Sequence, residues 1–160
     1  MSSALKRAWK NDEKVAALKM AIKGAKMLGD TKVLAFYPSM FVLLTDVLDA
    51  FGHLVFSRIH GKATDAATGK PLVDAFVARD VPADAKETCR NWFFKTACIR
   101  ELLPRLYLEM ALLPCYRFLS DASEVPQLFG RLASVIRGVG NPLVAVYARY
   151  GSLRHFVCKM

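Results

Sequence analysis

The chain of 160 residues is long enough to bury a substantial core and most simply forms a single domain, residues 1–160. Its hydrophobic content is 54%, and its formal net charge of +9 favours an anionic partner such as nucleic acid, a membrane surface or an acidic protein. The most apolar stretch, residues 33–59, contains Asp46, Asp49, His53 and Arg58. A spanning helix needs roughly 20 consecutive apolar residues, so we expect no transmembrane helix.

The cysteines carry information about redox state and metal binding. They occur at Cys89, Cys98, Cys115 and Cys158, without a C-x-x-C pair and among apolar residues at helical spacing. The N-terminal residues show no apolar core like that of a signal peptide, so we expect reduced, buried thiols in a cytosolic protein. The three histidines are scattered along the chain, which argues against a metal site.

The hydrophobic pattern predicts helices throughout. The first is expected at residues 11–27, with Asn11 or Asp12 as its N-cap. Its predicted apolar face consists of Val15, Leu18, Ile22 and Ala25. Residues 1–32 carry eight lysines and arginines against three acids. The simplest interpretation is that these charges form the solvated face of an amphipathic helix.

The second predicted helix starts at Pro38, a favourable first helical position, and extends to Ile59. Residues 60–84 are rich in glycine, proline and small polar residues, which predicts a long loop or an insertion between two helices. A third helix is expected at residues 85–102. A fourth is expected at 104–119, where Pro114 kinks or shortens it.

The last two predicted helices have clear boundary signals. One spans residues 124–137, with Ser123 as its cap and Gly138 at its end; the other is capped by Asn141, begins at Pro142 and runs to the C-terminus. Six helices joined mostly by short turns, with wide apolar faces, predict an all-α fold of stacked antiparallel hairpins, a HEAT-like α-solenoid.

Catalytic chemistry has little support in the sequence. Asp46 and Asp49 share a helical face and His53 lies one turn further, but no third group completes an acid–base set. A surface Asp–His contact is the simpler interpretation, and a small enzyme built on Asp49 and His53 is the weakest alternative. Without a glycine-rich phosphate loop, a metal-ligand cluster or an activated cysteine, we expect no enzymatic activity and no cofactor.

The stretch ELLPRLYLEM, residues 101–110, places a proline and an arginine in an otherwise apolar helical pattern. Pro104 suits the first turn of a helix, where its missing donor costs nothing. Arg105 is expected to pair with Glu101 or Glu109, or else with an acidic or carbonyl partner across a helix or subunit interface.

Three blocks, residues 17–59, 87–109 and 136–149, resemble in the same order the N-terminal part of the vacuolar protein sorting-associated protein 35-like family. This family supplies the large solenoid subunit of the retriever complex within the commander assembly. The motif PRLYLE at 104–109 is also similar to the PRLYL motif of the paralogous large subunit of retromer. The phrases NWFFK at 91–95 and FYP at 36–38 favour retriever.

The resemblance implies a non-enzymatic solenoid scaffold, cytoplasmic and peripheral on endosomes, that returns membrane-protein cargo to the cell surface. It implies an arrestin-fold subunit as partner, engaged through Pro104, Arg105, Leu106, Tyr107 and Leu108. Other commander components are further expected partners, whereas the phosphoesterase-fold subunit docks on distant C-terminal repeats. Family members are several times longer, so the chain is interpreted as a fragment or a short copy.

A second hypothesis belongs to a different class. Residues 6–32 could form a basic helical module that binds nucleic acid or an anionic membrane, with Lys19, Lys23 and Lys26 on one face. The aromatic residues follow core spacing and are not interleaved with basic ones, so nucleic-acid binding is not expected.

Overall fold

The computed structural model describes residues 1–64, 76–120 and 122–159, with the side chains of 122 and 155–159 left aside. Its α-helices are α1 (Ser2–Lys10), α2 (Lys14–Met27), α3 (Tyr37–Lys62), α4 (Ala83–Ala97), α5 (Leu102–Ala111), α6 (Val125–Ile136) and α7 (Pro142–Lys159). Short 3₁₀ helices lie at Leu34–Phe36, Ala78–Asp80, Leu113–Phe118 and Ala122–Glu124. The all-α, solenoid-like prediction is confirmed.

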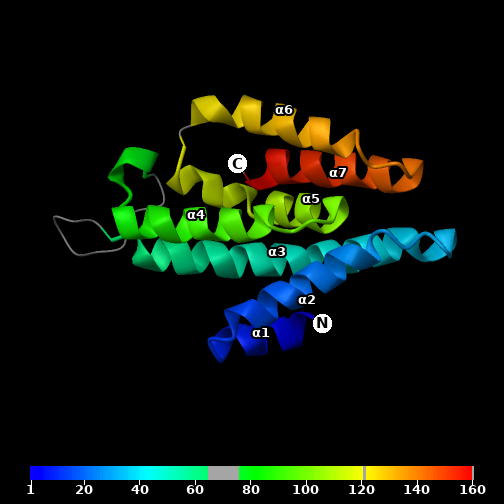
Figure 1. The fold of residues 1–160 in the computed structure, drawn as a ribbon, viewed down its shortest axis with the longest axis horizontal. Coiled ribbons are helices and arrows are strands. Elements are labelled where there is room, and N and C mark those ends of the chain that lie inside the picture. The colour runs from blue at the N-terminus through cyan, green and yellow to red at the C-terminus, as the bar shows by residue number, and fades with distance from the viewer. Residues whose placement is uncertain (65–75, 121, 160) are drawn as a thin grey trace.

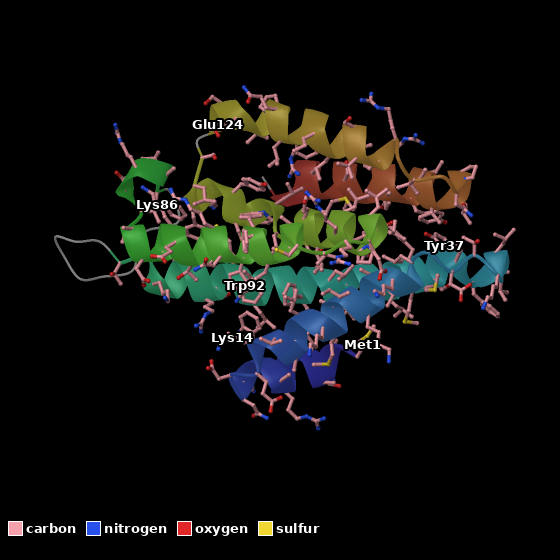
Figure 2. All side chains as sticks on the ribbon, in the orientation of Figure 1. Met1, Lys14, Tyr37, Lys86, Trp92 and Glu124 are labelled. Atoms are coloured by element: carbon pink, nitrogen blue, oxygen red, sulfur yellow. The ribbon has the colours of Figure 1, made fainter. Side chains whose placement is uncertain are left out.

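The helices stack in pairs. Figure 1 shows α1 and α2 along one edge, α3 beside α4 in the middle, and α6 beside α7 along the opposite edge, with α5 between them. α5 contacts α2, α3, α4, α6 and α7, so it is the centre of the domain. The side chains that fill the space between the layers are drawn in Figure 2.

The N-terminal region contains two helices where one was predicted. Asp12 adopts a φ of 63°, in the left-handed region, and the chain turns sharply between α1 and α2. Neither Asn11 nor Asp12 caps α2, whose N-cap Glu13 makes no side-chain capping bond. The predicted N-cap was therefore wrong.

The buried face of α2 agrees with the prediction in part, because Ala25 is buried and Leu18 and Ile22 are partly buried against the core. Its buried residues are Ala17, Ala21, Gly24 and Ala25, whereas Val15 is 61% exposed. Small side chains let α2 lie close against α1, α3 and α5 at once. The prediction was therefore wrong for Val15, and it missed the small buried residues Ala17, Ala21 and Gly24.

α1 is anchored by aromatic packing. Trp9 stacks on Trp92 of α4, with ring centroids 5.8 Å apart, and its edge meets Phe51 of α3 at 6.1 Å. Phe51 and Trp92 are themselves 5.7 Å apart, so the three rings form one cluster. The ring contacts hold α1 against α3 and α4. They stabilise the fold beyond the contribution from burying three large side chains.

α3 is the core helix. It includes Pro38 in its first turn, as predicted, and buries Phe41, Phe51, Val55 and Ile59. Leu34–Lys62 is long and apolar enough to cross a membrane by length and composition alone, because one 18-residue window within it has a mean hydropathy of 1.5. The core helix of a soluble protein passes the same test, and 44% of this window is buried inside the domain.

The connections after α3 confirm some boundary signals and correct others. α3 continues to Lys62 and α4 begins at Ala83, and residues 65–75 of the predicted loop at 60–84 lie outside the described residues. α4 ends at Ala97, five residues earlier than predicted. α5 ends at Ala111, and Pro114 lies at the start of a 3₁₀ helix, so the predicted shortening is confirmed.

The last two helices test two predicted caps. α6 is preceded by a 3₁₀ turn and has Glu124 as N-cap without a side-chain bond, so Ser123 was the wrong choice. Asn141 caps α7 as predicted. Its Oδ1 accepts the backbone N–H groups of Leu143 at 3.0 Å and Val144 at 3.2 Å.

A close backbone approach joins α3 to α5. A Cβ built on Gly52 would lie 2.1 Å from the carbonyl oxygen of Ala111 and 2.9 Å from its carbonyl carbon. No side chain fits there, and the obstacle is backbone that cannot swing aside. Gly52 therefore sets how near α3 and α5 can lie.

Replacing Gly52 with alanine should lower the free energy of unfolding by about 3 kcal/mol, because the two helices must separate. Urea unfolding followed by circular dichroism measures the change. Gly130 of α6 has open space around its position and is the matched control. Gly130→Ala should leave stability unchanged or raise it by less than about 1 kcal/mol; equal effects of the two substitutions would contradict the close contact.

Candidate partner-binding site

The predicted binding motif lies inside α5, which is buried on nearly all sides. Leu106, Tyr107 and Leu108 are at most 2% exposed, and Pro104 is buried as well. Pro104 is the third residue of α5, in the first turn, so it removes no hydrogen bond of the helix, as predicted. These four residues hold α5 in place and do not reach the protein surface.

Arg105 is the exception within the motif. Its side chain is 41% exposed, and its Nε donates to Oε1 of Glu109 at 3.0 Å, one turn further along α5. The local ion pair, one of the interpretations left open by the sequence, is therefore present. Glu101, the other candidate, instead accepts from Nζ of Lys26 on α2 at 2.5 Å.

Glu109 is the centre of a charged cluster. Its side chain is only 7% exposed, and its second oxygen, Oε2, lies 2.9 Å from Nη1 of Arg131 on α6. A carboxylate taken out of water needs paired charge to offset its lost hydration, and here two guanidinium groups supply it. The cluster has two positive charges and one negative, so it is cationic where it meets solvent.

Arg131 extends the cluster to Tyr116. Its Nη2 donates to the hydroxyl of Tyr116 at 3.3 Å, and the Tyr116 ring packs on Phe93 with centroids 4.2 Å apart. Burial raises the pKa of Tyr116, and the neighbouring charge of Arg131 opposes that shift. The sequence carries no signal for Arg131, because it lies on another helix, 22 residues after Glu109 in the numbering.

Tyr107 is a buried polar group in the apolar core. Its ring meets the Phe41 ring at 6.3 Å, and among the described residues its hydroxyl has no hydrogen-bond partner. Burial raises the pKa of Tyr107 well above its usual range, so the hydroxyl stays protonated. Tyr37 provides a contrast, because its hydroxyl donates to the carbonyl of Leu28 at 2.8 Å.

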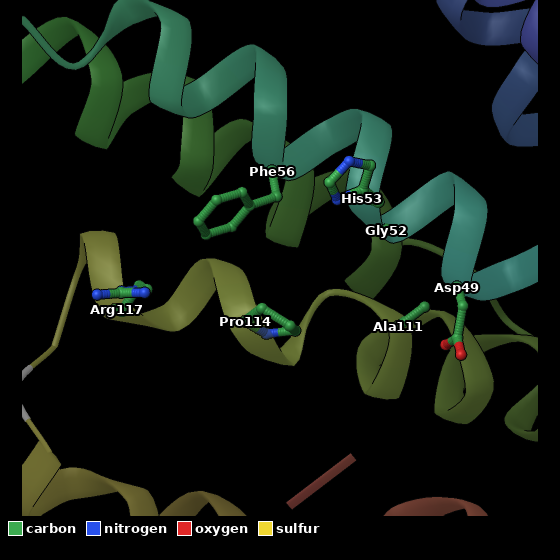
Figure 3. A pocket seen from close by; sticks show the side chains of 7 residues that line it. All are labelled: Asp49, Gly52, His53, Phe56, Ala111, Pro114 and Arg117. Atoms are coloured by element: carbon green, nitrogen blue, oxygen red, sulfur yellow. The ribbon is translucent and has the colours of Figure 1, made fainter. Parts of the chain in front are cut away.

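The predicted Asp–His face borders a shallow groove between α3 and the 3₁₀ helix Leu113–Phe118 (Figure 3). The groove has a volume of about 340 Å³ and is lined by Asp49, Gly52, His53, Phe56, Ala111, Pro114 and Arg117. Its charged groups already have partners. Asp49 pairs with Arg154 of α7, and the guanidinium of Arg117 lies 4.7 Å from the centre of the Phe76 ring.

These contacts give Asp49 a structural role, which is to join α3 to α7. Asp46 is exposed on α3 and does not line the groove. Asp49 and His53 both line the groove, and the described ion pair of Asp49 is with Arg154. Among the described residues, no three histidine, cysteine or acidic side chains converge to hold a metal ion.

The thiols differ in their surroundings. Cys89 and Cys115 are buried, and the Sγ of Cys89 donates to the carbonyl of Cys115 at 3.3 Å. Burial raises the pKa of Cys89 to about 12 and that of Cys115 well above its usual value. Cys98 is exposed because α4 ends at Ala97, so the prediction of buried thiols was wrong for that residue. The side chain of Cys158 is outside the described residues.

Comparison with known proteins agrees with the resemblance found in the sequence. The family described as VPS35L matches residues 1–158. The chain belongs to the VPS35L family. The Danio rerio protein named "VPS35 endosomal protein-sorting factor-like" is 54% identical over 149 residues, and the Homo sapiens protein of that name is 50% identical over 149 residues. A Dictyostelium discoideum relative is 46% identical over 151 residues.

The similarity covers 93% of this chain but about 15% of each of these three VPS35L relatives. The chain therefore corresponds to a small part of the relatives' length. It contains the PRLYL motif and the whole of α5.

The buried charge of Glu109 predicts a stability effect. Glu109→Gln should lower the free energy of unfolding by about 2 kcal/mol, because it leaves two guanidinium groups facing a neutral side chain. Urea unfolding measures the change. Glu87, exposed on α4, is the control, and Glu87→Gln should shift stability by less than about 0.5 kcal/mol. A silent Glu109→Gln variant would show that the cluster contributes nothing to the fold.

The cysteine environments predict a labelling pattern. Iodoacetamide at about pH 8 should modify Cys98 well before Cys89 and Cys115, because thiolate and access are both needed for reaction. Mass spectrometry of the digested protein locates the adducts at each position. Rapid modification of Cys89 in the folded protein would contradict its burial.

Proposed function

We propose that this chain is part of a non-enzymatic scaffold that sorts membrane proteins at endosomes. The observation that carries the proposal is the match of nearly the whole chain to VPS35L proteins, whose relatives are named endosomal protein-sorting factors. A stack of helical hairpins around a central helix supports a scaffold, since such stacks present extended surfaces to partners. The proposed place of action is the cytoplasmic side of endosomes, as a peripheral protein.

The proposed partner is the arrestin-fold subunit of a retriever-type complex, with other commander components further along the assembly. The PRLYL motif supports this assignment through its resemblance to the large subunits of retriever and retromer. Burial divides the motif into two roles. Pro104, Leu106, Tyr107 and Leu108 position α5, and Arg105 is the member that another protein can touch.

The geometry of Arg105 suits such a contact. A guanidinium offers five N–H donors. Among the described residues, the hydrogen bond from Nε of Arg105 to Glu109 uses one of these donors. With Glu109 fixed in turn by Arg131, the arginine is held in one orientation, which lowers the entropy lost when a partner carboxylate or carbonyl binds.

Binding to the purified arrestin-fold subunit tests this function. Arg105→Ala should weaken the affinity at least about tenfold, because a charged hydrogen bond at an interface is worth about 1.5–3 kcal/mol. Isothermal calorimetry measures the affinity, and circular dichroism checks that the variant stays helical. Arg100, exposed before α5, is the control, and Arg100→Ala should bind like the unchanged chain.

Two outcomes would remove the basis of the assignment. One is failure of the unchanged, folded chain to bind the arrestin-fold subunit. The other is equal binding by the unchanged chain and the Arg105→Ala variant.

A further inference from the structure

α1 and α2 form one edge of the domain (Figure 1), and this edge carries exposed cations that the proposed partner site does not use. They are Lys6, Arg7 and Lys10 on α1 and Lys19 and Lys23 on α2. Two other lysines of this region are already neutralised, because Lys14 pairs with Asp12 and Lys26 with Glu101. The basic residues predicted to act together are therefore divided into paired and exposed groups.

The exposed groups of α2 lie opposite its buried alanine face. Val15, Lys19, Lys23 and Met27 occur at every fourth position and are all exposed, so they form one row along the helix. The row begins and ends with an apolar residue. It leads directly into the connection between α2 and α3.

That connection exposes large apolar side chains. Leu34 is 63% exposed and Phe36 is 70% exposed, and both lie in the 3₁₀ turn that precedes α3. Val33 beside them and Leu43 in the second turn of α3 are exposed as well. We call Val33, Leu34, Phe36 and Leu43 the apolar corner. Lys32 precedes it, and the nearby acid Asp30 accepts the backbone N–H of Lys32 at 3.0 Å.

We propose that this edge docks directly on a membrane surface that carries anionic phospholipids, with Leu34 and Phe36 entering the headgroup layer while Lys19, Lys23 and Lys32 face the lipid phosphates. Exposed aliphatic and aromatic side chains beside lysines are the composition of interfacial membrane anchors. Each lysine near an anionic leaflet adds roughly 1 kcal/mol of attraction. The aliphatic stems of the lysines can lie along the apolar boundary while their ammonium groups stay in water.

Nucleic acid fits the same surface less well. Single-strand binding uses aromatic platforms interleaved with basic residues, and the exposed corner contains one aromatic ring among aliphatic side chains. α3 lies on the membrane surface in this arrangement and does not cross, since its buried face holds the core of the domain. This lipid contact uses none of the motif residues 104–108, so its test is independent of binding to the arrestin-fold subunit.

Sedimentation with vesicles tests the proposal. The unchanged chain should sediment with phosphatidylcholine vesicles that contain phosphatidylserine and stay in solution with phosphatidylcholine alone. Lys19→Gln combined with Lys23→Gln should weaken binding about 30-fold, the effect of two lysines at an anionic surface. Leu34→Ser combined with Phe36→Ser should weaken it at least about tenfold through lost apolar burial.

Matched control substitutions on other helices test whether vesicle binding depends on this edge or only on the total charge and exposed apolar area of the protein. Arg90→Gln with Arg149→Gln removes the same charge from α4 and α7, and Phe94→Ser with Leu153→Ser removes the same kinds of exposed side chain there. Both control pairs should bind vesicles like the unchanged chain. Equal losses in test and control pairs would overturn the proposal, as would failure of the unchanged chain to bind the anionic vesicles.

A parallel titration with single-stranded RNA tests nucleic acid as the alternative ligand of this edge. The membrane proposal would be overturned in favour of nucleic acid if the chain bound RNA but not vesicles. RNA binding would then be lost in the Lys19/Lys23 variant and unchanged in the Leu34/Phe36 variant. Circular dichroism of every variant verifies that the helices remain.

Discussion

The contact between the backbones of α3 and α5 is the constraint on which the rest of the domain depends. Gly52 allows it because any side chain at that position would meet the carbonyl of Ala111. Once α5 lies against α3, the remaining helices close around it, and two further glycines border its N-terminal end. Gly29 lies 3.4 Å from Leu103 and Gly138 lies 3.3 Å from Leu102, measured from a Cβ built on each glycine. α5 can be apolar on nearly all sides because it packs against α2, α3, α4, α6 and α7.

A helix so enclosed has little room for charge, which makes the Glu109 cluster informative. Burying the carboxylate costs hydration, and the cost is met by guanidinium groups from two different helices, Arg105 on α5 and Arg131 on α6. The pairing therefore fixes where α6 lies relative to α5. It also fixes the orientation of the one motif residue that reaches solvent. The same two contacts thus serve the fold and the proposed partner site, and a substitution in α6 is expected to act on both.

The accuracy of sequence reasoning differed between local and distant interactions. Proline positions and the Asn141 cap were predicted correctly, since a missing N–H or a side-chain oxygen acts within one helical turn. The division of α1 from α2 was missed because it depends on the left-handed backbone of Asp12, a residue that also fits an N-cap. The prediction for α2 missed the buried residues Ala17, Ala21 and Gly24 because alanine and glycine carry a weak hydrophobic signal although they permit the closest packing. Arg131 and the Lys26–Glu101 pair join segments far apart in the chain, so no pattern of spacing could reveal them.

The most recognisable motif of the chain is mostly buried, and this changes where function should be sought. Residues that set the position of a central helix are constrained by every neighbour they touch, whereas a binding surface needs side chains that remain accessible. Arg105 is both constrained by its neighbours and accessible to a partner. The α2 lysines and the apolar corner are accessible but are not constrained in this way. The pair between Lys26 and Glu101, at 2.5 Å, links α2 to the residue that precedes α5. Through this link the proposed membrane edge and the helix that carries the partner site belong to one packed unit. A partner held at Arg105 would therefore be held at a fixed position relative to the lipid surface.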